Sequence, residues 1–442
     1  MPEPYDLLFR AHRIMTPDGE VAGSVAVRDG RVAAVLGRAD AAGAAAVVQL
    51  AEDEVLIPGL VDTHVHVNEP GRTEWEGFAS ATAAAALGGV TTLIDMPLNS
   101  IPPTVDVAAL AQKQAAARGQ CHVDVGFWGG AVPGNLAELR GLHDAGVFGF
   151  KCFLLDSGVA EFPPLPADEL EPVLRELAAL GSRLIVHAED AESIDRAVPP
   201  AGGAYARFLA SRPRGAENLA IAWLLERARW TGAAVHVLHL SSSDALPMLA
   251  SARRDGVDVT VETCPHYLTF AAEDVPDGAT QFKCCPPIRE AANRELLWGG
   301  LTDGVIDIVV SDHSPCTPEL KGGDFGEAWG GIASLQVGLS AVWTGARERG
   351  HSLAEVVGWM ATAPARLAGL VDKGRIAPGA AADLVIFAPD EGTTVDVRRL
   401  AHRNPVTPYD GRALTGVVRG TWLRGRRIDV TEEAAGQLLR RV

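Results

Sequence analysis

The sequence predicts an α/β protein: a (β/α)8 TIM barrel with a small β-domain built from both termini. In the middle of the chain, short apolar β-branched runs alternate with alanine-rich segments, which is typical of repeated strand–helix units. Both ends contain only short apolar runs separated by turn residues, which favours strands. We therefore expect residues 58–367 to form the barrel. We expect residues 1–57 and 368–442 to form the two parts of the β-domain.

The individual elements follow from local patterns. Asp29-Gly30 interrupts an alternating apolar run, which predicts a hairpin. The alanine-rich segment 42–46 is interpreted as a turn region, and the alanines at 83–86 as part of a helix. Near the C-terminus, the runs 373–387 and 415–428 predict two further strands.

Composition excludes several classes of partner. The net charge is −17, so the surface should repel nucleic acids and anionic membranes. No apolar run is long enough for a membrane-spanning helix, and the N-terminal segment lacks the apolar core of a signal peptide. The six cysteines contain no C-x-x-C pair, which favours free thiols in a reducing compartment. We therefore expect a cytoplasmic protein without a nucleic-acid or membrane partner.

The clearest chemical signal is the segment Val61-Asp62-Thr63-His64-Val65-His66. On a strand, residues i and i+2 face the same side, so His64 and His66 can point at one metal ion. The Pro58-Gly59 pair before it suits entry into the first barrel strand.

Further metal-competent side chains end other predicted strands, namely His187, His239 and Asp312. Four neutral imidazoles and one carboxylate would leave two divalent ions poorly neutralised. Lys151 also ends a predicted strand, and burial there would favour its neutral amine. That amine can add CO2, and the resulting carbamate could bridge both ions. The sequence thus predicts a binuclear site at the carboxyl ends of the barrel strands.

Taken together, the segments HVH, GFKCFL, VHAED, HLSS and VSDHSPC resemble the cyclic amidohydrolases, which include dihydroorotase, hydantoinase (dihydropyrimidinase) and allantoinase. The resemblance covers nearly the whole chain. It implies His64 and His66 on one metal, His187 and His239 on the other, and a carboxylated Lys151 between them. Asp312 would be a ligand and a proton shuttle. The metals would be zinc, with cobalt, manganese or iron as alternatives, and the assembly a homotetramer.

Several longer blocks resemble the allantoinase branch of this family, among them residues 68–78, 96–105, 283–289 and 311–321. This implies metal-dependent hydrolysis of the hydantoin-ring amide of allantoin to allantoate by a bridging hydroxide, a step of purine catabolism and nitrogen utilisation. Dihydroorotase-like chains usually carry an arginine where this one has Asn68. The closest basic residue, Arg72, lies further along the loop.

Neutral polar groups are the candidates for binding such a substrate. They are Ser314, Asn99 and the backbone of Gly330 and Gly331. For Ser314 a simple turn role is an equal alternative. Three other functions stay open: another cyclic amidohydrolase (a hydantoinase or dihydroorotase), a mononuclear deaminase-type relative, and a non-catalytic scaffold with this fold.

Overall fold

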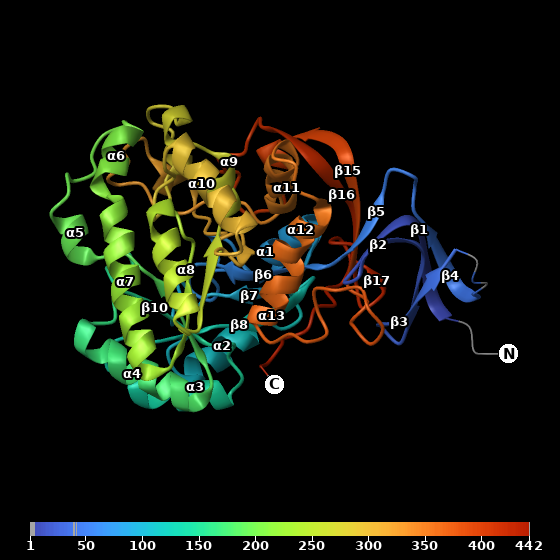
Figure 1. The fold of residues 1–442 in the computed structure, drawn as a ribbon, viewed down its shortest axis with the longest axis horizontal. Coiled ribbons are helices and arrows are strands. Elements are labelled where there is room, and N and C mark those ends of the chain that lie inside the picture. Colours follow the sequence, from blue (N-terminus) through green and yellow to red (C-terminus); the bar gives the residue numbers. More distant parts are fainter. Residues whose placement is uncertain (1–4, 39, 41, 442) are drawn as a thin grey trace.

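The computed structural model describes residues 5–38, 40 and 42–441. Residues 1–4, at the start of the predicted β-domain, lie outside the described residues. Figure 1 shows a helix-rich body that contains the parallel strands, and beside it a region of strands made from both ends of the chain. Among the described residues, no helix has the length and apolarity required to cross a bilayer.

The outer sheet joins N- and C-terminal strands. Its order is β17-β16-β15-β5-β1-β2-β3, and β4 pairs with β1. The N- and C-terminal parts of this sheet are joined by β5 and β15, which pair antiparallel with Leu56 opposite Ile386. The strands are β1 (Tyr5–Thr16), β2 (Gly19–Arg28), β3 (Arg31–Gly37), β4 (Ala44–Gln49), β5 (Val55–Pro58), β15 (Leu384–Thr394), β16 (Ala413–Leu423) and β17 (Arg426–Arg427).

The predicted hairpin is confirmed: Asp29 and Gly30 both have positive φ, 51° and 73°, between β2 and β3. Two local predictions were wrong. Segment 42–46 is not a turn, because Ala44 begins β4 and pairs in parallel with Tyr5; tertiary pairing overrides the low strand preference of alanine. The strand expected from residue 373 begins only at Leu384.

The helical body contains parallel strands only. One set has the order β6-β7-β8 and the other β14-β13-β12-β11-β10-β9. The strands are β6 (Leu60–Val65), β7 (Val90–Asp95), β8 (Asp124–Phe127), β9 (Gly129–Gly130), β10 (Phe150–Phe153), β11 (Arg183–His187), β12 (Ala234–Val237), β13 (Val259–Thr263) and β14 (Ile308–Val309).

Short contacts connect the two sets at both edges. The Trp128 N–H donates to the Asp95 carbonyl at 3.0 Å. At the other edge, Val65 forms a parallel bridge with His313, and the His66 N–H donates to the His313 carbonyl at 2.8 Å. The carboxyl ends of the first and last strands therefore lie side by side, which brings their functional side chains together.

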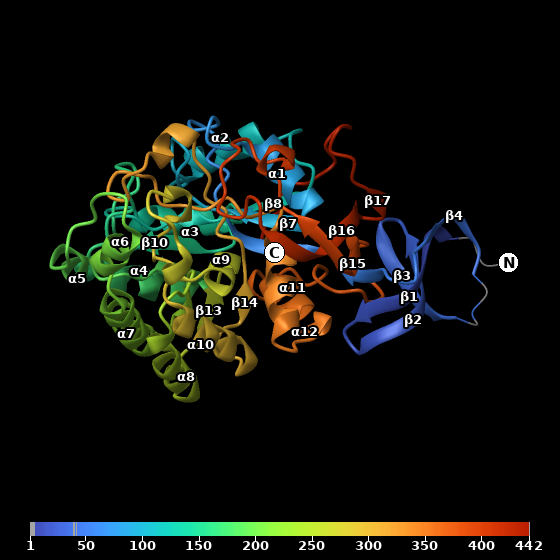
Figure 2. The ribbon, with the colours of Figure 1, turned by 90° about the horizontal axis from the view of Figure 1, so that it is seen from above.

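Helices cover the outside of these strands (Figure 2). They are α1 (Phe78–Leu87), which includes the predicted alanine helix, α2 (Val107–Ala117), α3 (Leu139–Asp144), α4 (Ala167–Leu180), α5 (Ala191–Asp195), α6 (Tyr205–Ser211), α7 (Arg214–Thr231), α8 (Leu246–Arg254), α9 (Pro265–Thr269), α10 (Ala291–Thr302), α11 (Gly338–Glu348), α12 (Leu353–Val357) and α13 (Ala363–Leu367). A π-turn spans Gly358–Thr362, and single 3-10 turns span Leu136–Glu138, Ser243–Ala245, Ala272–Asp274, Thr280–Phe282, Pro318–Lys321 and Val397–Arg399.

A buried ion cluster ties the two regions together away from the strand carboxyl ends. Lys373 donates to Asp124 of β8 and to Asp383 next to β15, both at 2.6 Å. Arg424 contacts both oxygens of Asp124. The C-terminal segment then runs along β8, where the Val125 N–H donates to the Gln437 carbonyl at 2.9 Å.

Candidate metal centre

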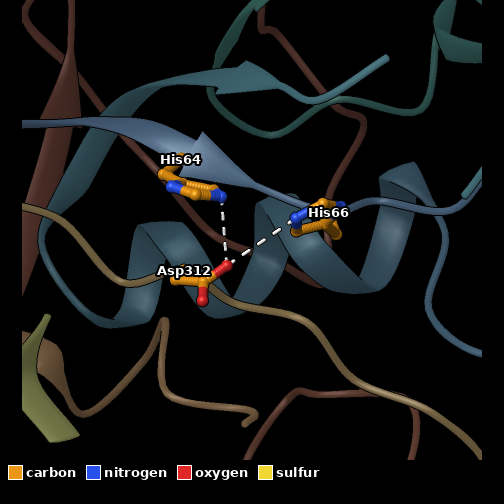
Figure 3. A group of neighbouring side chains, drawn as sticks. All are labelled: His64, His66 and Asp312. Atoms are coloured by element: carbon orange, nitrogen blue, oxygen red, sulfur yellow. Dashed lines mark ion pairs between the residues drawn. The ribbon is translucent and has the colours of Figure 1, made fainter. Parts of the chain in front are cut away.

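Three of the predicted ligands meet where β6 ends and the chain leaves β14. His64 Nε2 lies 3.1 Å from Asp312 Oδ1, and His66 Nε2 lies 3.7 Å from the same oxygen. Figure 3 shows both rings pointing at the carboxylate. All three side chains are buried. An oxygen and two imidazole nitrogens at this spacing can hold a divalent ion.

Lys151 reaches the same point from within β10, which continues to Phe153, so the prediction that Lys151 ends its strand was wrong. Its Nζ lies 3.4 Å from His64 Nε2, and the side chain is 1% exposed. Burial lowers the pKa of Lys151 to about 8, so an appreciable fraction is neutral amine near neutral pH. This is the form that can react with CO2.

His187 and His239 complete the group. Their ring centroids are 4.5 Å apart, and the His239 ring lies 5.5 Å from that of His64. Phe153 stacks on His187 at 4.6 Å. The structure therefore brings together all six residues for which the sequence predicts a role in metal binding.

Glu262 of β13, which we did not predict, sets the orientation of His64. The Nδ1 of His64 donates to Glu262 Oε1 at 2.5 Å, and His236 Nε2 donates to the other oxygen at 2.9 Å. Burial would raise the pKa of Glu262, but these histidines hold it well below its usual range. With Nδ1 occupied, His64 has only Nε2 to offer a metal, which is how metal-binding imidazoles are usually fixed.

Glu189, which we also did not predict, sets the orientation of His187. It accepts from His187 Nε2 at 2.8 Å and from Arg212 at 2.6 Å. The Nδ1 of His187 is then left for a metal. His66 follows the same rule, because its Nδ1 contacts the Leu98 carbonyl at 3.2 Å. Glu189 lies two residues after His187, so a search for carboxylates close in sequence to the predicted ligands would have found it. Glu262 is far from His64 in sequence and gives no such local signal.

The electrostatics of the centre favour bound cations. Burial would lower the pKa of His64, but Asp312 and Glu262 raise it to about 9. The pKa of Asp312 is held well below its usual range by His64, although burial opposes this. The centre contains three imidazoles, each with one nitrogen free for a metal. It also contains a carboxylate and a lysine that can carry CO2. This set of groups fits a pair of divalent ions.

The candidate substrate-binding residues lie around this centre, and they differ in how many of their hydrogen-bonding groups are already used. The Asn99 side chain is buried and donates to Asn68 Oδ1 at 3.0 Å. Ser314 follows Asp312 by two residues, and its N–H donates to the Ile332 carbonyl at 3.0 Å. The N–H of Gly331 donates to the Lys283 carbonyl at 2.8 Å, so that donor is already used.

Gly331 is required for packing. A Cβ there would lie 2.2 Å from the Ser314 carbonyl oxygen. The backbone of Gly330, by contrast, makes no hydrogen bond with another described residue. Of the two glycines, Gly330 is the one with free groups to offer a ligand.

Arg72 is not a free cation. It forms an ion pair with Glu161, and it donates to the Asn99 carbonyl at 2.6 Å. Its guanidinium also lies over the Trp75 ring, 5.1 Å from the centroid. A substrate carboxylate would have to compete with Glu161 for this residue.

Comparison with known proteins defines the class. The model of the amidohydrolase family matches residues 55–428, and the chain belongs to this family. It is 57% identical to allantoinase of Streptomyces avermitilis over 99% of both chains. It is 49% identical to allantoinase of Saccharomyces cerevisiae over 84% of this chain and 82% of that one. Among solved structures, L-hydantoinase (dihydropyrimidinase) from Arthrobacter aurescens superposes with a TM-score of 0.93 at 32% identity, covering 99% of this chain and 100% of that chain.

Proposed function

We propose that this chain hydrolyses the ring amide of allantoin to allantoate on a binuclear metal centre. The full-length similarity to allantoinases carries the choice of substrate. The convergence of four histidines, Lys151 and Asp312 supports the chemistry. The proposal includes a closed eight-stranded barrel, which the contact between Val65 and His313 supports.

His64, His66, His187, His239 and Asp312 would hold the two ions, with zinc as the first candidate, and carboxylated Lys151 would lie between them. When bound, such a pair supplies a water of lowered pKa and a Lewis acid for the ring carbonyl. Glu262 and Glu189 keep the histidine rings in the orientation that binding requires.

Asp312 is the proton carrier in this proposal. As a carboxylate it accepts a proton from the attacking water while the new C–O bond forms. It then delivers that proton to the ring nitrogen as the C–N bond breaks, which leaves a neutral ureido nitrogen and a carboxylic acid that releases the second proton of the water to solvent. Its low pKa supports the ionised starting form.

The surroundings of the centre suit a neutral ring. Asn68 occupies the position where dihydroorotase-like chains usually carry an arginine. Arg72 is neutralised by Glu161. Asn99, Ser314 and Gly330 would supply hydrogen bonds instead. A site built on hydrogen bonds rejects analogues that leave those groups unpaired.

The test is steady-state turnover of allantoin, hydantoin, dihydrouracil and dihydroorotate by the metallated protein, with a chelated sample as control. We expect kcat/KM for allantoin to exceed that for dihydroorotate at least about 100-fold, or roughly 2.7 kcal/mol, with hydantoin between them. Preference for hydantoin or dihydrouracil would favour a hydantoinase, and preference for dihydroorotate would contradict the proposal. The homotetramer stays a prediction, to be measured by light scattering.

A further inference from the structure

Lysine is rare in this chain, and its placement is selective. There are five lysines among 39 basic residues, so arginine accounts for the other 34. Lys113 and Lys373 form buried ion pairs with aspartates, and Lys151 lies at the metal centre. Lys283 and Lys321 differ, because their ammonium groups contact carbonyl oxygens and form no ion pair with a described carboxylate.

Lys321 uses its whole hydrogen-bonding capacity on the backbone beside the candidate site. Its Nζ donates to the carbonyls of Trp329 and Gly331, both at 2.7 Å, and to that of Lys283 at 3.3 Å. An ammonium has three donors, and each therefore has a backbone acceptor. One side chain thus connects three segments: 283–285, 318–321 and 329–331.

The Lys321 contact with the Trp329 carbonyl fixes the peptide plane before Gly330. The plane after Gly330 is fixed by the Gly331 N–H, which donates to the same Lys283 carbonyl that Lys321 contacts. A peptide unit is planar and trans, so its N–H and C=O point in opposite directions. The Trp329 carbonyl faces Lys321, and the Gly330 N–H in the same plane therefore points away from it. The Gly331 N–H faces the Lys283 carbonyl, so the Gly330 carbonyl also points away.

Gly330 thereby presents a free donor and a free acceptor side by side. It is partly exposed, whereas Gly331 is buried. Segment 331–332 runs next to Ser314, two residues from Asp312. A neighbouring donor and acceptor match the N–H and C=O of a cyclic amide. Without Lys321, the plane before Gly330 would lose its hydrogen-bond partner, and the Lys283 carbonyl that holds the plane after it would lose one of its two donors, so the pair would lose its alignment.

We propose that Lys321 is a positioning residue for substrate specificity, which holds the Gly330 peptide groups in the orientation that binds the cyclic amide. It acts through the backbone and does not touch the substrate. The proposal rests on the proposed function, because it assumes that the site binds a cyclic amide.

The experiment compares Lys321→Met with Lys321→Arg and Lys283→Met in the metallated enzyme. Methionine matches the lysine side chain as far as Cε and removes all three donors, whereas arginine keeps charge and donors. The matched control is Lys283→Met, because the Lys283 ammonium contacts Ala328 at 2.5 Å, outside the planes that flank Gly330. For Lys321→Met we expect KM for allantoin to rise at least about 10-fold, equivalent to about 1.4 kcal/mol, with kcat within about 3-fold and metal content unchanged. Lys321→Arg should recover part of the KM, and Lys283→Met should change it far less.

Amide hydrogen exchange gives a readout that needs no substrate. In Lys321→Met, exchange in segment 329–331 should accelerate at least about 10-fold relative to wild type. Unchanged exchange and unchanged KM would overturn the proposal, as would an equal effect of Lys283→Met. If the wild type failed to hydrolyse allantoin while exchange still accelerated, the proposed function would be wrong and the positioning of the loop would stand.

Discussion

Glu189 accepts a hydrogen bond from Nε2 of His187 at 2.8 Å, and this contact decides that Nδ1 faces the metal centre. The carboxylate is itself held by Arg212. Two residues outside the ligand set thus determine the orientation of a ligand.

The first prediction follows from that contact. Glu189→Gln removes the negative charge and can present an N–H to His187, which would favour the wrong tautomer. We expect metal affinity to fall about 10- to 100-fold, measured by competition with a chelator. Glu290→Gln is the control, because Glu290 pairs with Arg214 at 2.6 Å on the exposed side. Unchanged affinity in Glu189→Gln would mean that Glu189 serves only to neutralise Arg212.

Lys151 gives the second prediction. Lys151→Ala should lose most bound metal and activity, because two dications need an anionic bridge. Short carboxylic acids should partly restore both by replacing the carbamate. Metal analysis and turnover measure this, and mass spectrometry under CO2 tests for the added mass on wild-type Lys151. A fully metallated, active enzyme with unmodified Lys151 would contradict the prediction.

For Asp312, the prediction separates proton transfer from metal binding. Asp312→Asn keeps an oxygen for a metal but cannot accept a proton as a carboxylate does. Turnover should fall about 10²- to 10⁴-fold, while metal content falls much less. Near-normal turnover would assign the base to another residue.

The pH dependence of KM should report the titration of Lys321. Burial lowers the pKa of Lys321 to about 8. The groups that face it are Cys316, Cys284, Lys283 and Cys285, and burial raises the pKa of each of these thiols, so they remain uncharged. Below about pH 8 the ammonium has three donors, and above it the amine has two. We therefore expect KM to rise as the pH increases through 8.

Lys321→Arg is the control for this pH profile, because a guanidinium keeps its charge over the whole range. Its KM should stay flat where that of the wild type rises. The same rise in both proteins would assign the titration to another buried lysine, Lys283 or Lys151, since burial lowers the pKa of each.

The last prediction concerns stability. Lys373→Met leaves the buried carboxylates of Asp124 and Asp383 without their shared cation. Breaking a buried pair in this way typically costs about 3–5 kcal/mol, and Arg424 should keep the cost near the lower end. The apparent free energy of unfolding in urea measures it. Arg175→Met, which breaks an exposed pair with Glu171, should change it by less than about 1 kcal/mol.

Much of the candidate site was predictable, because its rules are local. His64 and His66 lie two residues apart on one strand, so they must face the same side. His187 ends β11 and His239 follows the end of β12, and parallel strands bring such ends to one edge, whereas Lys151 lies within β10. The hairpin at Asp29-Gly30 was also predictable, because Asp-Gly is a local turn signal. Segment 42–46 was not, because its strand depends on pairing with β1.

By itself, the sequence determined which side chains could meet: strand periodicity and strand ends select the histidines, Lys151 and Asp312 with no knowledge of the rest of the chain. Only the tertiary structure decided which partners tune them. Glu262 reaches His64 across 198 positions, and Glu161 neutralises Arg72 across 89. Such pairs depend on how neighbouring strands and loops pack, and no local period encodes that. The same packing lets Lys321 hold the peptide planes around Gly330.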